Sequence, residues 1–435
     1  RLKGYGQKEA IAEIEMELDN VRLAWERAIQ MKRLDAIAQA LEPLWNFYIY
    51  RDRLQEGESV FSHAVNALRS VETPSVGYGL LLALHGALHR RVERSTLAEQ
   101  HMSEGVAMLT QLDASHELAL ANIWNSYGTS DEVIRRLRDC RAVFEAHSDR
   151  WGMTAACFNL AMSIETTGNW IEGRKYFSES LNLARTSGDS LGQAAALSGL
   201  GWNSYRLGKY PDSLNFFKES RQIYRQMSTP GGAASALRGM GTVSWLLKDY
   251  TAATEHFFEA LDIYRRLGVR TGIAATLSGL GMIAWLSGNH DEGVKFAQES
   301  ITLYRELDDP RQLSNVLVNL GHPLVSLGRF DEARPPFREA IAVSTQIGAI
   351  IPILEAMAGL AGIYGKTGRV EDALRLLAFA MANPRIDAET KGIVEHYMSG
   401  LKPTISPERM LAMMEEGRLL SMEQASKIAL EDSTA

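Results

Sequence analysis

The chain has 435 residues and a formal net charge of −7, with 46 Lys and Arg against 53 Asp and Glu. This charge argues against a surface that neutralises phosphates, so we expect no direct binding of nucleic acid. The two cysteines, Cys140 and Cys157, exclude a disulfide scaffold and a four-thiolate metal site, and they favour a cytoplasmic setting. No apolar run approaches the ~18 residues that span a bilayer, so no membrane segment is expected.

The N-terminal segment, residues 1–32, differs from the rest of the chain. It begins at Arg1 rather than Met, which indicates a piece of a longer protein. Apolar residues at helical spacing predict one amphipathic helix from Glu9 to Ile29. We expect this segment to be a linker helix that leads into the following residues.

Internal repetition dominates the remainder. From residue 150 the sequence repeats at a spacing of 40 without an insertion, with glycines in register at 199, 239, 279 and 359 and phenylalanines at 177, 217, 257 and 337. Earlier segments fit the same pattern, although two of them are one or two residues short. We predict a repeat array over 33–389, with units near 33–72, 73–111, 112–149, 150–189, 190–229, 230–269, 270–309, 310–349 and 350–389, and C-terminal capping helices over 390–435.

Each unit has the pattern of two helices joined by a short turn. In 270–309, for example, two stretches with helical periodicity flank Ser287-Gly288-Asn289. Glycines recur inside the first helix, where each costs ~1 kcal/mol relative to alanine, so we expect a neighbouring helix to pack too closely for a Cβ. Stacked hairpins would share one continuous core. The predicted fold class is therefore an all-α, right-handed superhelical solenoid of about nine hairpins.

The repeat residues carry a family resemblance. The order Leu200-Gly201, Gly208, Tyr210, Ser213, Phe217, Ser220 resembles the tetratricopeptide signature, and it recurs in the later units. The unit has 40 residues rather than 34, as in the long-helix variant of that repeat. Trp45 departs from the pattern because it stands at the glycine position of the first unit. The resemblance implies a binding function without defining the ligand.

Both flanks resemble segments of bacterial regulatory ATPases of the STAND class. The string from Glu17 to Trp25 is similar to the segment that leads from their nucleotide-binding and winged-helix domains into the repeats. In the tail, Ser406-Pro407-Glu408 predicts a helix start, and Ser421 with Gln424 predicts a capping box for a last helix. The string from Glu416 to Ala425 is similar to the closing segment of such regulators, which often precedes a LuxR-type helix-turn-helix. Generic capping helices remain the alternative.

No pattern of catalytic residues is evident. The string Gly359 to Thr367 is a near miss to a phosphate loop, but leucine stands at 360, where that motif needs glycine. His85 and His89 share a helix face, yet Gly86 replaces the glutamate of a zincin motif and no third ligand is apparent. We therefore predict neither enzymatic activity nor a cofactor or metal ion in this chain.

The candidate site is the concave groove formed by the first helices of the units. Positions 40 residues apart there carry Tyr205, Trp245, Trp285 and Val325. Aromatic side chains supply contact area at low entropic cost, and arginine can bind a carboxylate through two hydrogen bonds. Filling of the space between successive helices is the alternative role for these rings. The predicted groove residues are Trp202, Tyr205, Arg206, Arg238, Trp245, Met282, Trp285, Asn315 and His322.

The resemblance implies a sensor module of a STAND-type signalling ATPase involved in transcriptional regulation. A protein, peptide or small-molecule effector in the groove would relieve autoinhibition of upstream ATPase domains that this chain lacks. Two alternatives stay open: a free-standing scaffold for protein–protein interaction, and a peptide-pheromone receptor. A phosphate loop upstream in the parent gene would favour the first reading over both.

Overall fold

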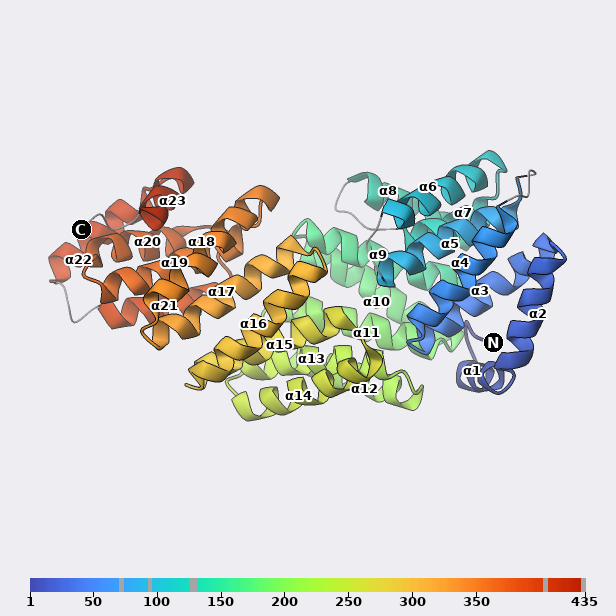
Figure 1. Cartoon of the computed structure of the whole chain (residues 1–435), viewed down its shortest axis with the longest axis horizontal. Coiled ribbons are helices and arrows are strands. Elements are labelled where there is room, and N and C mark those ends of the chain that lie inside the picture. Colours follow the sequence, from blue (N-terminus) through green and yellow to red (C-terminus); the bar gives the residue numbers. More distant parts are fainter. Residues whose placement is uncertain (70–73, 93–95, 126–130, 402–405, 432–435) are drawn as a thin grey trace. The chain divides into compact units, whose positions relative to one another are not determined.

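The computed structural model describes residues 1–69, 74–92, 96–125, 131–401 and 406–431. Every regular element in these ranges is an α-helix, and the helices follow one another as packed antiparallel pairs, which confirms the predicted all-α solenoid (Figure 1). The chain divides into two compact units, residues 1–267 and 268–435. None of the described helices has the length and apolarity needed to cross a membrane.

The first unit begins with two helices that precede the hairpins. They are α1 (Gln7–Met16) and α2 (Leu18–Gln30). Six hairpins follow, and they consist of α3 (Leu34–Tyr50) with α4 (Leu54–Leu68), α5 (Val76–Val92) with α6 (Thr96–Gln111), α7 (Ser115–Trp124) with α8 (Asp131–Ala146), α9 (Arg150–Thr166) with α10 (Trp170–Ser187), α11 (Ser190–Arg206) with α12 (Tyr210–Gln226), and α13 (Pro230–Leu246) with α14 (Tyr250–Leu267).

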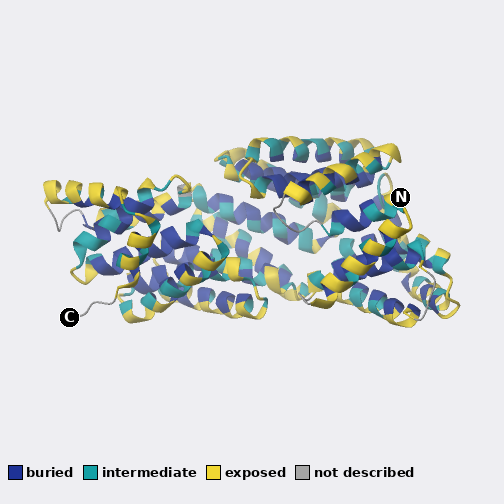
Figure 2. Cartoon of the chain, turned by 90° about the horizontal axis from the view of Figure 1, so that it is seen from above, coloured by how far each residue is buried: buried dark blue, intermediate teal, exposed yellow. Residues whose placement is uncertain are grey.

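In the second unit, residues 268–401 and 406–431 form three hairpins and three further helices. The hairpins are α15 (Arg270–Leu286) with α16 (His290–Glu306), α17 (Pro310–Ser326) with α18 (Phe330–Ile347), and α19 (Ile350–Lys366) with α20 (Val370–Ala382). The further helices are α21 (Ala388–Leu401), α22 (Pro407–Arg418) and α23 (Met422–Leu430). Figure 2 shows that the helices bury the face turned toward their neighbours and expose the opposite face. The division into linker, array and cap stays a prediction; its boundary at 72/73 and residues 432–435 lie outside the described residues.

The turns within the hairpins explain one set of repeated glycines. Gly208, Gly288 and Gly328 have φ angles of 71°, 83° and 73°, and a Cβ placed on any of them would meet nothing within 4 Å. Backbone conformation rather than space therefore favours glycine here, because side chains with a Cβ rarely adopt positive φ. The sequence prediction for these turns is confirmed.

The glycines inside the first helices have a different cause. Phe217 on α12 is fully buried between two of them. A Cβ on Gly201 of the same hairpin would lie 2.7 Å from its ring, and one on Gly239 of the next hairpin 2.5 Å. Gly321 and Gly359 enclose the ring of Phe337 in the same way, at 2.3 and 2.1 Å. Each phenylalanine thus joins two successive hairpins through a socket that only glycines leave open.

The sequence argument for these glycines was correct about close packing but incomplete about the neighbour. At Gly281 the neighbour is backbone, as expected, since its Cβ would lie 3.3 Å from the carbonyl oxygen of Gly293 on α16. At Gly201 and Gly239 the neighbour is an aromatic ring. Periodicity shows that space is restricted, but it does not show which atoms restrict it.

The N-terminal segment forms two helices rather than the single helix predicted from Glu9 to Ile29. Helix geometry breaks at Glu17, where φ is −99° and ψ is 13°. The break allows the two helices to pack on different parts of the first unit. Trp25 on α2 stacks on Phe61 of α4 with ring centroids 5.9 Å apart. Gln7 at the start of α1 instead forms hydrogen bonds with the start of α11. Tertiary contacts at both ends therefore override the continuous amphipathic pattern.

The C-terminal helices α22 and α23 have the predicted starts. The Ser406 hydroxyl accepts a hydrogen bond from the Arg409 N–H, and Ser421 forms a capping box with Gln424. Helix α22 packs on α20, where Arg375 pairs with Glu416 at 2.8 Å. Helix α21, which the sequence analysis did not distinguish, instead packs on α19 and α20.

Glu355 on α19 makes the contact with α21 sensitive to pH. Its carboxyl is buried and accepts a hydrogen bond from the Thr390 hydroxyl at 2.9 Å. Burial, together with the nearby charge of Asp387, raises the pKa of Glu355 from 4.5 to about 8. The folded chain therefore holds a proton that the unfolded chain releases, so this contribution to stability is complete below pH 4.5 and is lost as the pH rises to about 8.

We expect Glu355→Gln to reduce this pH dependence. The unfolding free energy of the parent should fall between pH 5 and pH 8.5. Because the amide cannot ionise, the fall should be smaller in the variant by at least ~1 kcal/mol. Urea unfolding followed by circular dichroism at the two pH values measures the difference. A parallel fall in both proteins would contradict the assignment of this effect to Glu355.

Candidate ligand-binding pocket

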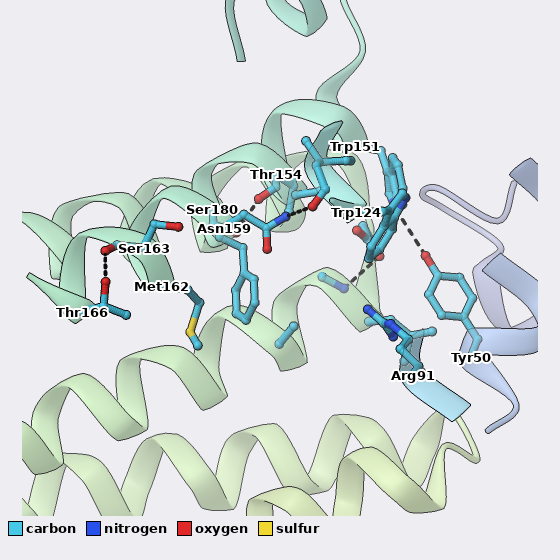
Figure 3. Close-up of a pocket in the computed structure, with 17 residues that line it drawn as sticks. Tyr50, Arg91, Trp124, Trp151, Thr154, Asn159, Met162, Ser163, Thr166 and Ser180 are labelled. Atoms are coloured by element: carbon cyan, nitrogen blue, oxygen red, sulfur yellow. Dashed lines mark hydrogen bonds between the residues drawn. The ribbon is translucent and has the colours of Figure 1, made fainter. Parts of the chain in front are cut away.

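A cavity of about 450 Å³ lies among the first helices of the first unit (Figure 3). Helices α3, α5, α7, α9 and α11 supply most of its walls, so the repeated stacking of hairpins builds it from residues far apart in sequence. Apolar and aromatic side chains predominate. The lining residues are Tyr50, Arg91, Ile123, Trp124, Trp151, Thr154, Ala155, Phe158, Asn159, Met162, Ser163, Thr166, Ser180, Asp189, Leu191, Gly192 and Ala195.

Three aromatic side chains form one side of the pocket. The rings of Trp124 and Trp151 lie 6.2 Å apart and are tilted by 47°, and the indole N–H of Trp151 donates to the hydroxyl oxygen of Tyr50 at 3.3 Å. Burial raises the pKa of Tyr50 well above its ordinary value, so its hydroxyl remains neutral. Figure 3 shows these residues together with Arg91 on the same side of the cavity. This wall offers flat apolar area to a ligand.

Arg91 supplies a positive charge to the same wall. Its guanidinium carbon lies 5.4 Å from the ring centroid of Trp124 and 5.9 Å from that of Trp45. Such placement over aromatic faces is favourable and orients the guanidinium. Arg91 is exposed, and across the described parts of the chain no carboxylate forms an ion pair with it. Its hydrogen-bond donors are therefore available to an anionic group.

Helix α9 forms the other wall with Phe158, Asn159 and Met162. The Asn159 amide nitrogen donates to the carbonyl oxygen of Ile123 at 2.8 Å, so the Asn159 side-chain oxygen remains as an acceptor. Met162 is substantially exposed, and its flexible thioether can adapt to different shapes. The two walls together suit a ligand with an apolar body and a polar or anionic end.

The pocket has no evident nucleophile. The hydroxyls of Thr154 and Ser180 donate to backbone carbonyl oxygens, at 2.9 and 3.0 Å. Burial raises the pKa of the Cys140 and Cys157 thiols to about 12, so neither is a thiolate at neutral pH. Helix α19 contains the whole near-miss phosphate loop up to Lys366, without a preceding strand.

The N-terminal segment contacts this pocket directly. The side chain of Gln7 donates to a carboxylate oxygen of Asp189 at 2.9 Å and accepts from the backbone N–H of Leu191 at 3.0 Å. Asp189 and Leu191 both line the cavity. The ammonium of Lys3 lies 4.9 Å from the ring centroid of Trp151. A movement of these pocket residues can therefore alter the contacts that hold residues 1–7.

Most of the groove residues predicted from the sequence lie at accessible positions. Trp202, Tyr205, Arg238, Trp245 and Asn315 are half-buried, and Arg206 is exposed. Cation–π contacts already involve four of them: Arg238 lies 5.0 Å from the ring centroid of Trp202, and Arg206 lies 5.7 Å from that of Tyr205. The role of these six residues in binding stays a prediction.

The other three predicted groove residues require a correction. Met282, Trp285 and His322 are buried, although an open groove would leave them accessible. Trp285 stacks on His322 with centroids 4.6 Å apart, and α21 covers the pair: the Tyr397 hydroxyl forms a 2.8 Å hydrogen bond with the His322 ring, and His396 packs edge-on against Trp285. The protein's own helix thus occupies the place expected for an effector.

The sequence analysis missed the pocket because it followed the groove register forward only from residue 190. Met162 stands 40 residues before Trp202, which is one of the predicted groove residues, and Phe158 lies one helical turn before Met162. Extending it one unit back would have identified the α9 wall. Arg91 and Trp124 belong to units of irregular length, where no fixed spacing places them opposite α9. Only the folded structure brings them there.

The helices and their pairing define the class of protein: an all-α helical-repeat solenoid. Residues 153–226, 232–306 and 272–346 match the tetratricopeptide repeat family. These residues are therefore tetratricopeptide repeats. No curated protein matches the sequence.

Several solved structures are similar to this chain. A Rap protein in complex with Competence and Sporulation Factor has 14% identity over 88% of this chain and 99% of that one, with a TM-score of 0.52. The quorum sensor NprR from B. thuringiensis, in its apo form, has 17% identity over 76% and 99%, also with a TM-score of 0.52. A STAND protein with a tetratricopeptide repeat sensor from Pyrococcus horikoshii has 12% identity over 83% and 55%, with a TM-score of 0.45. These identities show the fold alone.

Proposed function

We propose that this chain is a cytoplasmic sensor module that binds a peptide, or a small molecule of similar chemistry, in the pocket between α5, α7 and α9. The observation that carries the proposal is the pairing of an apolar, aromatic cavity with the exposed guanidinium of Arg91 at its wall. A free carboxylate beside an apolar or aromatic group matches both features. Two of the similar solved structures support a signal-binding role, since one is a complex with Competence and Sporulation Factor and another is a quorum sensor.

The N-terminal segment supplies a route for the signal. Because Gln7 binds Asp189 and Leu191, a ligand that displaces either pocket residue weakens the attachment of α1. The resemblance of residues 17–25 to a STAND linker then supports a regulatory role: effector binding would relieve autoinhibition of ATPase domains N-terminal to this segment. A phosphate-binding loop encoded upstream of Arg1 in the parent gene is the expected finding. Its absence would favour the peptide-receptor or scaffold alternatives.

The ligand assignment can be tested with peptides. The probe is a library of fluorescein-labelled hexapeptides that end in an aromatic or leucine residue, each made with a free and with an amidated C-terminus. We expect the free acids to bind better, and Trp124→Ala to weaken their binding by about 30-fold, as for a hot-spot residue worth ~2 kcal/mol. Arg91→Gln should weaken the free acids and leave the amides nearly unaffected. Fluorescence anisotropy measures each affinity.

A matched variant separates this pocket from the groove predicted by sequence. Trp245→Ala removes the same ring from that groove without touching the pocket lining. Equal affinity for this variant and the parent supports the pocket. Binding that survives Trp124→Ala but is lost in Trp245→Ala would reject the pocket and return the site to the predicted groove.

A further inference from the structure

We propose that Glu58, His85 and His89 form a binding site for a divalent transition-metal ion, with Zn²⁺ as the best match. The sequence analysis predicted no metal ion because the His85 and His89 pair had no evident third ligand. The structure supplies one: Glu58 on α4 lies against both histidines of α5, and one ligand atom from each of the three residues lies within 4.8 Å of the others.

The distances suit tetrahedral coordination. The Glu58 Oε1 atom lies 3.4 Å from His85 Nε2 and 3.0 Å from His89 Nδ1. Two ligands at ~2.1 Å from a tetrahedral ion are separated by roughly 3.4 Å, so small side-chain shifts would place one ion between all three. Two imidazoles and one carboxylate form a donor set that Zn²⁺ accepts, with water in the fourth position.

The His85 ligand is enclosed by the protein. His85 is 1% exposed. Burial lowers the pKa of His85, and the neighbouring His101 lowers it further, so the imidazole is neutral at pH 7. A neutral imidazole presents a lone pair, which is the form that binds a metal ion. The carboxylate of Glu58 supplies the negative charge.

His101 on α6 acts as a positioning residue. Its Nδ1 atom lies 2.8 Å from the Nδ1 atom of His85, so one ring donates to the other. When His85 donates through Nδ1–H, its Nε2 atom carries the lone pair and lies beside Glu58. A metal-bound histidine commonly donates its second ring N–H to a neighbouring acceptor, which fixes the ring orientation. An ion here would clamp α4, α5 and, through His101, α6.

The experiment uses the whole chain, free of any histidine tag, after dialysis against EDTA. Titration with Co²⁺ should give the visible absorption of a tetrahedral site at one equivalent, and Zn²⁺ should displace it and raise the melting temperature. Glu58→Gln and His89→Gln should each weaken Zn²⁺ binding by at least about 100-fold, and His101→Ala by about 10–100-fold. His85 is left intact because its burial makes substitution disruptive.

A second histidine–carboxylate pair provides the control. The His63 Nε2 atom lies 3.1 Å from a carboxylate oxygen of Glu26, and the His63 side chain is well exposed. Among the described residues, this pair has no third side chain close enough to complete a metal site. His63→Gln should bind Zn²⁺ as the parent does. In EDTA, Glu58→Gln and His89→Gln should melt within a few degrees of the parent, so that lost binding does not reflect lost folding. No Co²⁺ spectrum, or Zn²⁺ binding that persists in both variants, would overturn the site.

Discussion

Phe217→Ala should lower the unfolding free energy by about 3–5 kcal/mol, because it empties the socket between Gly201 and Gly239. The glycines have no Cβ with which to fill the space, and the two hairpins lose the ring that joins them. The cost should therefore lie at the upper end of the range for buried phenylalanine. Urea unfolding followed by circular dichroism at 222 nm provides the measurement.

Phe258→Ala is the matched control for this prediction. Phe258 also lies on a second helix of the first unit, but it is 48% exposed, whereas Phe217 is 0% exposed. Removing it should cost less than ~1 kcal/mol, as for most surface changes. Equal losses in the two variants would show that the glycine sockets do not join the hairpins.

Trp285→Ala should also cost about 3–5 kcal/mol, while Trp245→Ala should cost much less. The two tryptophans stand at equivalent repeat positions, yet Trp285 is 4% exposed and Trp245 is half-buried. Trp285 stacks on His322, and its indole N–H donates to the Ser326 hydroxyl at 2.9 Å. Its removal leaves a cavity beneath α21 and deletes the hydrogen bond to Ser326, whereas solvent can fill the space left by Trp245.

Chemical unfolding of both variants beside the parent tests this contrast. The experiment also reports on α21, since the burial of Trp285 depends on His396 and Tyr397 of that helix. Similar small losses for both tryptophans would mean that α21 does not seal the groove of the second unit. In that case Trp285 would again be available to an effector, as the repeat pattern predicted.

The sequence alone was sufficient for the repeat, the helix pairs, the positive-φ turns and the cap at Ser421. Each of these features depends on residues close together in the chain, or on a fixed period of 40 that repeats the same local environment. The restricted space at Gly201 and Gly239 follows from that period as well, but the contact of both glycines with the ring of Phe217 came from the structure. Such regularity makes position in the repeat a guide to burial for the residues that pack between adjacent hairpins.

Only the tertiary structure decided which groove positions are open and which are covered. Trp245 and Trp285 share a repeat position, but α21, a segment outside the repeat, packs on Trp285. Likewise, Gln7 reaches Asp189, and Glu58 reaches His85 and His89, through contacts that no periodicity specifies. Segments without the period pack wherever their own side chains bury best. The candidate pocket, the proposed metal site and the covered tryptophan therefore arise from long-range packing rather than from the repeat.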